Sequence, residues 1–223
     1  MAQKPHVAIF PSPGMGHLIP LAELAKKLAL SYDLSSTFIV PSIGPPPEAQ
    51  TKSLVASTRL VALVLDLFGT DVIDIAMEFS VPSYIASLST GCATPVHGRD
   101  LPDPIQDRKD DAYKWFLHHS SRHGLAEGIL LNSFVDLEPE TIKGFAGSRT
   151  CAGLKVALRP EVDGNGLVGR EEIAKVVKGL MQGGEGVAIR NRMKGLKEAA
   201  AKAVSEEGSS TKSLHELVSR WKN

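Results

Sequence analysis

The chain has 223 residues, with 25 acidic and 25 basic side chains that leave no formal net charge at neutral pH. This length can bury one substantial core and a second small one, and the composition is not that of fibrous, disordered or membrane-spanning chains. Without a net positive field, neither nucleic acid nor a membrane surface is an expected partner.

Five short apolar runs mark the first part of the chain, at residues 7–10, 37–40, 60–65, 84–88 and 128–131. They are continuous rather than alternating, which is typical of parallel strands covered on both faces. Helical patterns over residues 17–30 and 70–79 follow the first and third runs. Strands that alternate with helices predict an α/β fold, a Rossmann-like, doubly wound parallel sheet.

Further elements follow with a different character. Residues 45–47 and 92–104 are rich in proline and predict rigid loops, and residues 107–123 and 139–145 predict helices. Beyond this point turn-forming residues dominate before three amphipathic helical patterns begin. We therefore predict a Rossmann-like domain over residues 1–146, a linker over 147–169 and a helical segment over 170–223.

The sequence also favours a cytoplasmic location. Near Lys4 only four consecutive apolar residues occur, too few for the core of a signal peptide. Cys92 and Cys151 stand alone, outside any spacing that builds a zinc site, and isolated thiols are typical of a reducing compartment.

His17 and Asp66 form the first candidate site. His17 lies at the start of the first predicted helix and Asp66 at the end of the third predicted strand. Ligands of open α/β sheets bind at the carboxyl ends of strands, so one crevice can hold both residues. A carboxylate on one imidazole nitrogen leaves the other free to take a proton from a bound hydroxyl. In the alternative interpretation, His17 caps the helix and Asp66 only binds backbone amides.

The turn PSPGMG before His17 is a second candidate. Gly14 and Gly16 allow the backbone to approach a ligand, and amides at the helix start can meet a phosphate. As a nucleotide fingerprint the pattern is weak, because Pro20 replaces the third glycine of GxGxxG. A simple tight turn explains it equally well.

Three other clusters favour structural interpretations. Asp71 and Asp74 follow Thr70 as first-turn acids and are expected to cap a helix. The histidines His118, His119 and His123 are expected on a solvated helix face, without a metal. Residues 163–166, DGNG, predict a turn rather than a calcium loop.

Several blocks of the chain, taken together in order, resemble a known family. They are HVAIFPSPGMGHLIPLAELAKKL, LVLDLFGTDVIDIAMEFSVPSYIASLST, LPDPIQDRKDDAYKWFLHH, AEGILLNSFVDLEPETIK and ALRPEVDGNGLVGREEIAKVVKGLM. They are similar to the plant family-1 UDP-glycosyltransferases, in particular to the group that glucosylates hydroquinone.

The resemblance implies a GT-B fold whose first domain, residues 1–146 here, binds the acceptor. It also implies that His17 is the general base, that Asp66 is its partner, and that Ser89 lies near the donor sugar. The implied substrates are UDP-glucose and a small phenol, with no cofactor.

The chain also departs from the family. The donor-binding signature from WAPQ through HCGWNS is absent, since the two tryptophans, Trp115 and Trp221, stand in unrelated contexts. After Phe145 the chain continues almost directly into residues 170–223, which resemble the last helices of the family. Further gaps are indicated near residues 48–57 and 88–92. We therefore expect a truncated glycosyltransferase with weak or no activity.

Other interpretations stay open. The chain can be a non-catalytic protein that binds a small molecule or a partner, or that self-associates through exposed helices. A product that does not fold is a third interpretation, because lost strands expose sheet edges.

Overall fold

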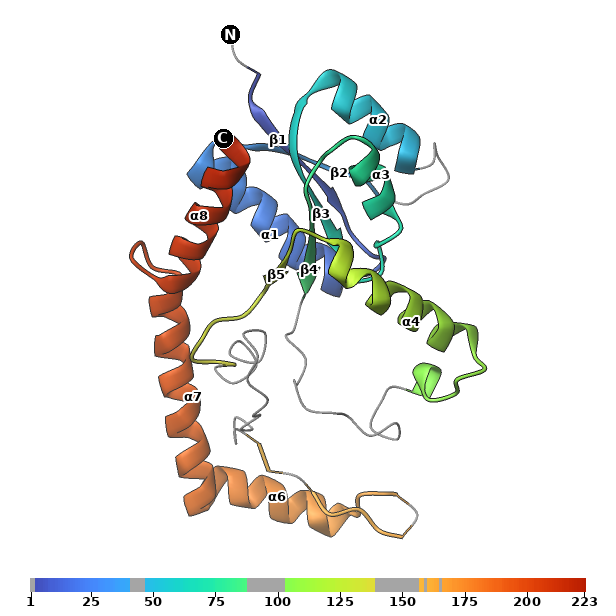
Figure 1. The fold of residues 1–223 in the computed structure, drawn as a ribbon. Coiled ribbons are helices and arrows are strands. Elements are labelled where there is room, and N and C mark those ends of the chain that lie inside the picture. The colour runs from blue at the N-terminus through green and yellow to red at the C-terminus, as the bar shows by residue number, and fades with distance from the viewer. Residues whose placement is uncertain (1–2, 41–46, 88–102, 139–156, 159, 165) are drawn as a thin grey trace. The chain divides into compact units, whose positions relative to one another are not determined.

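The structure is a computed structural model that describes residues 3–40, 47–87, 103–138, 157–158, 160–164 and 166–223 (Figure 1). The chain forms two compact units, one of residues 1–133 with 214–223 and one of residues 134–213. Each unit is considered by itself. Ser89, Cys92, Cys151, the expected helix 139–145 and the expected boundary at residue 146 lie outside the described residues.

A parallel sheet forms the centre of the first unit. Its strand order is β2-β1-β3-β4-β5, and all neighbouring pairs are parallel. The strands are β1 (Pro5–Phe10), β2 (Ser35–Phe38), β3 (Arg59–Asp66), β4 (Ser83–Ser87) and β5 (Gly128–Leu131). The predicted doubly wound α/β sheet is confirmed.

Two apolar clusters cover the two faces of this sheet. Alternate residues of the central strands point to opposite faces, as pleating requires. On one face Val7, Ile9 and Val64 pack against Leu21, Ala25 and Leu28 of α1 (Met15–Tyr32). On the other face Ala8, Leu63 and Leu65 pack against Val72, Ile73 and Ala76 of α3 (Val72–Glu78). The continuous apolar strands therefore reflect burial on both faces.

The last helix, α8 (Ser209–Lys222), completes the first of these clusters. Trp221 and Val218 are buried in it, and the rings of Trp221 and Tyr84 meet edge to face with centroids 5.4 Å apart. Arg59 Nη2 donates a hydrogen bond of 2.7 Å to the carbonyl of Lys222. The carboxyl end of the chain is thus part of the core of the first unit.

Several element boundaries differ from those expected, among them those of the second strand and the fourth helix. The second strand is Ser35–Phe38 rather than residues 37–40, because its register with β1 pairs His6 with Ser35 and Ile9 with Phe38. The fourth helix, α4 (Asp111–Arg122), begins later than residue 107, because Asp110 accepts a hydrogen bond of 2.7 Å from the Ala112 amide as its N-cap.

One helix was not expected at all. Residues Pro47–Ser57 form α2, which packs Leu54 and Val55 against the second cluster. Its apolar residues are few and do not form a clear stripe, so periodicity does not reveal it. Short 3-10 turns at Asp103–Ile105 (η2) and His123–Leu125 (η3) flank α4.

The described part of the second unit contains α6 (Arg170–Gln182) and α7 (Gly184–Ala203), which together with α8 are the three helices expected after residue 170. Gly186 allows α7 to approach the end of α6, since a Cβ there would lie 2.1 Å from the carbonyl oxygen of Leu180. Over all described residues, no helix has both the length and the apolar character needed to cross a bilayer.

Candidate active site

The topology of the sheet defines where chemistry can occur. In the order β2-β1-β3, the connections that leave β1 and β3 run to opposite faces, since α1 covers one face and α3 the other. A crevice opens at such a point, outside the carboxyl ends of the two strands. His17 follows β1, and Asp66 is the last residue of β3. The structure therefore places both predicted residues at the switch point.

His17 and Asp66 are in direct contact. The distance from His17 Nδ1 to Asp66 Oδ2 is 2.7 Å, while the side chains are 29% and 2% exposed. The N–H direction at Nδ1 does not meet hydrogen-bond geometry. The terminal torsion of histidine is soft, so a small rotation of the ring aligns Nδ1–H with the carboxylate oxygen. The buried nitrogen is Nδ1, so Nε2 is the nitrogen left for a ligand.

Backbone amides hold the carboxylate in place. The Leu67 amide donates to Asp66 Oδ1 at 2.6 Å, and the Ser12 amide donates to Oδ2 at 3.3 Å. Part of the alternative interpretation is therefore correct for Asp66, which binds backbone amides as well as His17. His17 is the third residue of α1, and the N-cap is Gly14, so His17 does not occupy the capping position.

The turn before α1 depends on one glycine. Gly14 has φ of 116°, a conformation that side chains disfavour, and its carbonyl accepts from the amides of His17 and Leu18. A Cβ on Gly16 would meet open space. Ser12, which is 7% exposed, has a buried hydroxyl without a hydrogen-bond partner among the described residues. The binding role of Gly14 and Gly16 stays a prediction.

Phe68 is a neighbour that sequence reasoning did not identify. Its ring meets the imidazole of His17 edge-on, with centroids 6.3 Å apart, and meets His119 in the same way at 6.0 Å. The available signal was its place two residues after Asp66, in the turn at the end of the strand. This turn is tight, because a Cβ on Gly69 would lie 2.7 Å from Phe10 Cδ1.

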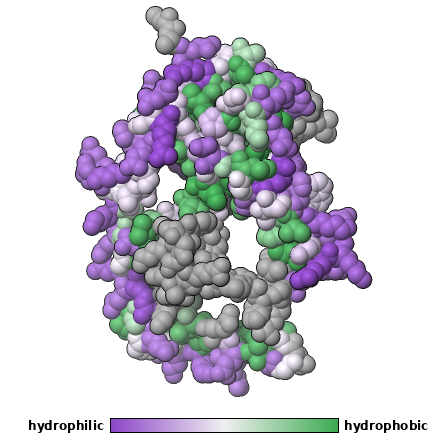
Figure 2. All heavy atoms as spheres, in the orientation of Figure 1, coloured by the Kyte–Doolittle hydropathy of each residue, from purple (hydrophilic) through white to green (hydrophobic). Residues whose placement is uncertain are grey.

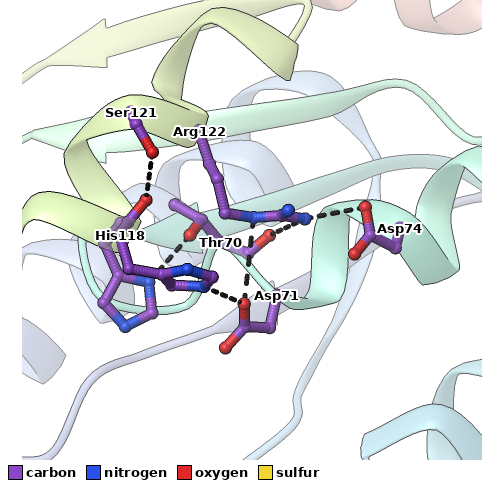
Figure 3. A network of polar contacts seen from close by, with 7 residues as sticks. Thr70, Asp71, Asp74, His118, Ser121 and Arg122 are labelled. Atoms are coloured by element: carbon purple, nitrogen blue, oxygen red, sulfur yellow. Dashed lines mark hydrogen bonds and ion pairs between the residues drawn. The ribbon is translucent and has the colours of Figure 1, made fainter. Parts of the chain in front are cut away.

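A second polar cluster joins α3 to α4 (Figure 3). His118 Nε2 lies 2.6 Å from Asp71 Oδ1, and Arg122 Nη2 lies 2.7 Å from Asp74 Oδ1. Asp71 is the N-cap residue of α3 but makes no side-chain capping bond. The expectation that Asp71 and Asp74 cap the helix is thus wrong for their side chains, which bind a neighbouring helix instead.

The expected solvated histidine face is also wrong in part. His119 is 8% exposed, and its Nδ1 forms a hydrogen bond of 2.7 Å with the hydroxyl of Thr70. Burial lowers the pKa of His119; Asp71 raises it by a smaller amount, and the nearby His118, His123 and Arg122 lower it further. His119 is therefore neutral near neutral pH.

Metal-ligating atoms of Asp71, His118 and His119 lie within 4.8 Å of one another. Asp71 and His118 are already bound to each other, and His119 Nδ1 is bound to Thr70. Arg122 Nε is 3.8 Å from Asp71 Oδ1, so a cation is already present beside the carboxylate. A polar link between helices accounts for this cluster without an ion.

No family model matches the chain. It is similar to hydroquinone glucosyltransferase of Rauvolfia serpentina, with 28% identity over 466 aligned residues that span 100% of this chain and 99% of that protein. Since this chain has 223 residues, more than half of those aligned positions have no counterpart in it.

A second relative is more similar to this chain, over a shorter alignment. UDP-glycosyltransferase 72B3 of Arabidopsis thaliana is 38% identical over 219 residues, which cover 62% of this chain and 45% of that protein. Among solved structures, a UDP-glucosyltransferase from Polygonum tinctorium, described as capable of glucosylating indoxyl, superposes with a TM-score of 0.84. It is 26% identical over 100% of this chain and 99% of that one.

These findings confirm the resemblance that the sequence predicted, in both sequence and fold. They also agree with the predicted internal truncation, because the relatives are about twice as long as this chain. The chain is similar to plant UDP-glycosyltransferases and is internally shortened with respect to them.

Proposed function

We propose that this chain is a glycosyltransferase-like protein of the cytoplasm whose site acts on the hydroxyl of a small phenol, with UDP-glucose as donor and no cofactor. The observation that carries the proposal is the contact of 2.7 Å between His17 Nδ1 and the buried carboxylate of Asp66. Such a pair, at the switch point of a doubly wound sheet, is arranged for proton abstraction.

The proposed reaction is an inverting displacement. His17 Nε2 takes the proton of the phenol as the phenolic oxygen attacks the anomeric carbon of the sugar. The bond between that carbon and the UDP oxygen breaks, and UDP leaves with the electron pair. Asp66 fixes the tautomer of His17 and stabilises the imidazolium that forms. Gly14, Gly16 and Ser89 would lie along the substrates.

The rate is expected to be low. Proton abstraction needs only the residues of the switch point, whereas transfer also needs the diphosphate and the sugar to be held in line. The donor-binding signature is absent from the sequence. Positioning and stabilisation of a leaving group each contribute several kcal/mol to catalysis. We therefore propose that the chain retains acceptor binding and has weak or no transferase activity.

The test is an assay of the purified chain with UDP-glucose and hydroquinone, with product measured by chromatography and binding of each substrate by calorimetry. Hydroquinone binding without UDP-glucose binding supports the proposal. Any transfer should fall about 100-fold or more in His17→Ala, since general base catalysis contributes this much.

His215→Ala is the matched control, because it removes an exposed histidine of α8 whose nearest ring contact is Tyr32. Rapid transfer by the wild-type chain, at a rate that His17→Ala does not change, contradicts the role of His17. Tight binding of UDP-glucose contradicts the loss of the donor site.

A second candidate function is an interaction protein. No residue of α6 is buried, and Ile173, Val177 and Met181 are each at least half exposed. Apolar patches interrupt the hydrophilic surface over this helix, at the bottom of the view in Figure 2. An apolar stripe of this kind can bind a partner or a second copy of the chain.

Sedimentation velocity over a range of concentrations tests this alternative. Self-association that Val177→Lys abolishes supports an interface on α6. A monomer at every concentration contradicts self-association and leaves the acceptor-binding proposal in place.

A further inference from the structure

The turn that follows Asp66 is bound to α4, a helix far along the chain. Thr70, which is fully buried, forms a hydrogen bond of 2.7 Å with His119 Nδ1, although 49 residues separate them. Phe68, in the same turn, packs its ring against the ring of His119 with centroids 6.0 Å apart. One side chain of α4 therefore contacts the turn at two points.

The same turn is in contact with the proposed base. Phe68 meets the imidazole of His17 edge-on at 6.3 Å, and the Leu67 amide donates to Asp66 Oδ1 at 2.6 Å. Any shift of the turn would move both the carboxylate partner and the ring that covers one side of His17. The contacts thus run without a break from His119 through Phe68 to His17.

We propose that His119 is a positioning residue, which fixes the turn of residues 67–70 and through Phe68 restricts the orientation of the His17 imidazole. The effect of His119 on catalysis rests on the proposed function of His17. The restricted orientation of the His17 imidazole does not, because it can be measured without substrate.

Three further observations support this role. His119 is held from its other side, since the indole of Trp115 stacks on it with centroids 5.8 Å apart and an angle of 26°. The ion pair between Arg122 and Asp74, at 2.7 Å, ties the next turn of α4 to α3. Burial lowers the pKa of His119, so its ring is neutral and its bond to Thr70 persists near neutral pH.

The experiment is proton NMR on the ligand-free chain, with cross-peaks between the rings of Phe68 and His17 as the readout. We expect these cross-peaks in the wild-type chain and their loss in Thr70→Val, which removes only the hydroxyl that binds His119. They should return in Thr70→Ser and be lost in His119→Ala. The exposed His215→Ala serves as the matched control and should keep them.

Folding is checked in each variant by circular dichroism and by the fluorescence of the tryptophans. Thr70→Val conserves the shape of the side chain, so it is expected to fold even if His119→Ala does not. Cross-peaks that persist in folded Thr70→Val overturn the proposal, and so does their absence from Thr70→Ser. Loss in the His215→Ala control also overturns it.

Hydroquinone titration of the same samples separates this inference from the proposed function. Weaker binding by Thr70→Val than by Thr70→Ser, with both chains folded, is the expected result. If even the wild-type chain binds no phenol, the proposed function fails, while the cross-peaks still decide whether His119 positions the turn.

Discussion

Among the described residues of the first unit, two contacts between a histidine and an aspartate are almost equally short. His17 lies 2.7 Å from Asp66, and His118 lies 2.6 Å from Asp71. The two carboxylates differ in surroundings, because the side chain of Asp66 is 2% exposed and that of Asp71 is 59% exposed. Distance alone therefore does not separate a chemical site from a link between helices.

Burial and position in the fold make the difference. Asp66 ends a central strand, accepts two backbone hydrogen bonds and contacts His17 at the switch point of the sheet. Asp71 is the N-cap residue of a short helix, and its side chain is exposed, so water competes for its charge. A buried carboxylate can therefore orient a base, whereas an exposed one mainly connects elements.

The largest expected effect concerns the stability of the two sites. Asp66→Ala leaves the Ser12 and Leu67 amides without their acceptor, and we expect the free energy of unfolding to fall by about 3 kcal/mol. Asp71→Ala, which breaks an exposed pair, should cost less than about 1 kcal/mol. Urea denaturation of both variants measures the difference. Equal losses would contradict the distinction between the two pairs.

A second prediction concerns the turn that joins the two contacts. Gly69→Ala places a Cβ 2.7 Å from Phe10 Cδ1, inside the van der Waals distance. We expect a loss of about 1–3 kcal/mol, the usual cost of overpacking. The free energy of unfolding measures it.

Gly124→Ala is the matched control for this change, because a Cβ at Gly124 would meet nothing within 4 Å. If both alanine variants are equally stable, the turn is not as tightly held as its contacts indicate. The turn would then not be a rigid connection between the two histidine–aspartate contacts.

The site at the switch point could be predicted from sequence for a clear reason. Continuous apolar runs located the ends of β1 and β3, and parallel strands bring their carboxyl ends to one edge. His17 and Asp66 were therefore expected together although they are 49 positions apart in sequence. The resemblance to glycosyltransferases strengthened their chemical interpretation, while the fold class followed from the pattern of strands and helices.

The second cluster could not be predicted because its partners come from elements whose packing the sequence does not reveal. Asp71 and Asp74 have the spacing of helix caps, and only the approach of α4 turns them toward Arg122. His119 follows the apolar residues 115–117, but these side chains are themselves exposed, and its burial follows from contact with Thr70 and Phe68. Local periodicity does not report such tertiary contacts.

A third prediction uses pH to separate buried from exposed histidines. Burial lowers the pKa of His119 and of His6, which is held between Ser35 and Thr37. The unfolded chain therefore binds protons more readily once the pH falls below about 6.5. The contribution of these two histidines to the free energy of unfolding should be fully present above that pH. It should decrease as the pH falls toward their lowered pKa values in the folded chain.

Urea denaturation from about pH 7 to about pH 5 measures this decrease. His119→Asn and His6→Asn should each flatten the dependence, because asparagine does not titrate. His215→Ala removes an exposed histidine and should leave it unchanged. A slope that neither asparagine variant alters would contradict the burial of these two rings.

The smallest expected effect is the coupling within the exposed cluster. In a double-mutant cycle of His118→Ala and Asp71→Ala, we expect a coupling energy of about 0.2–1 kcal/mol. The coupling should decrease in about 1 M NaCl, where the screening length falls to about 3 Å. The two hydrogen bonds that Asp66 accepts from backbone amides are buried and should respond far less to salt. A coupling that survives high salt would show that the pair is shielded from water, and the exposed aspartate would then resemble the buried one in its energetics.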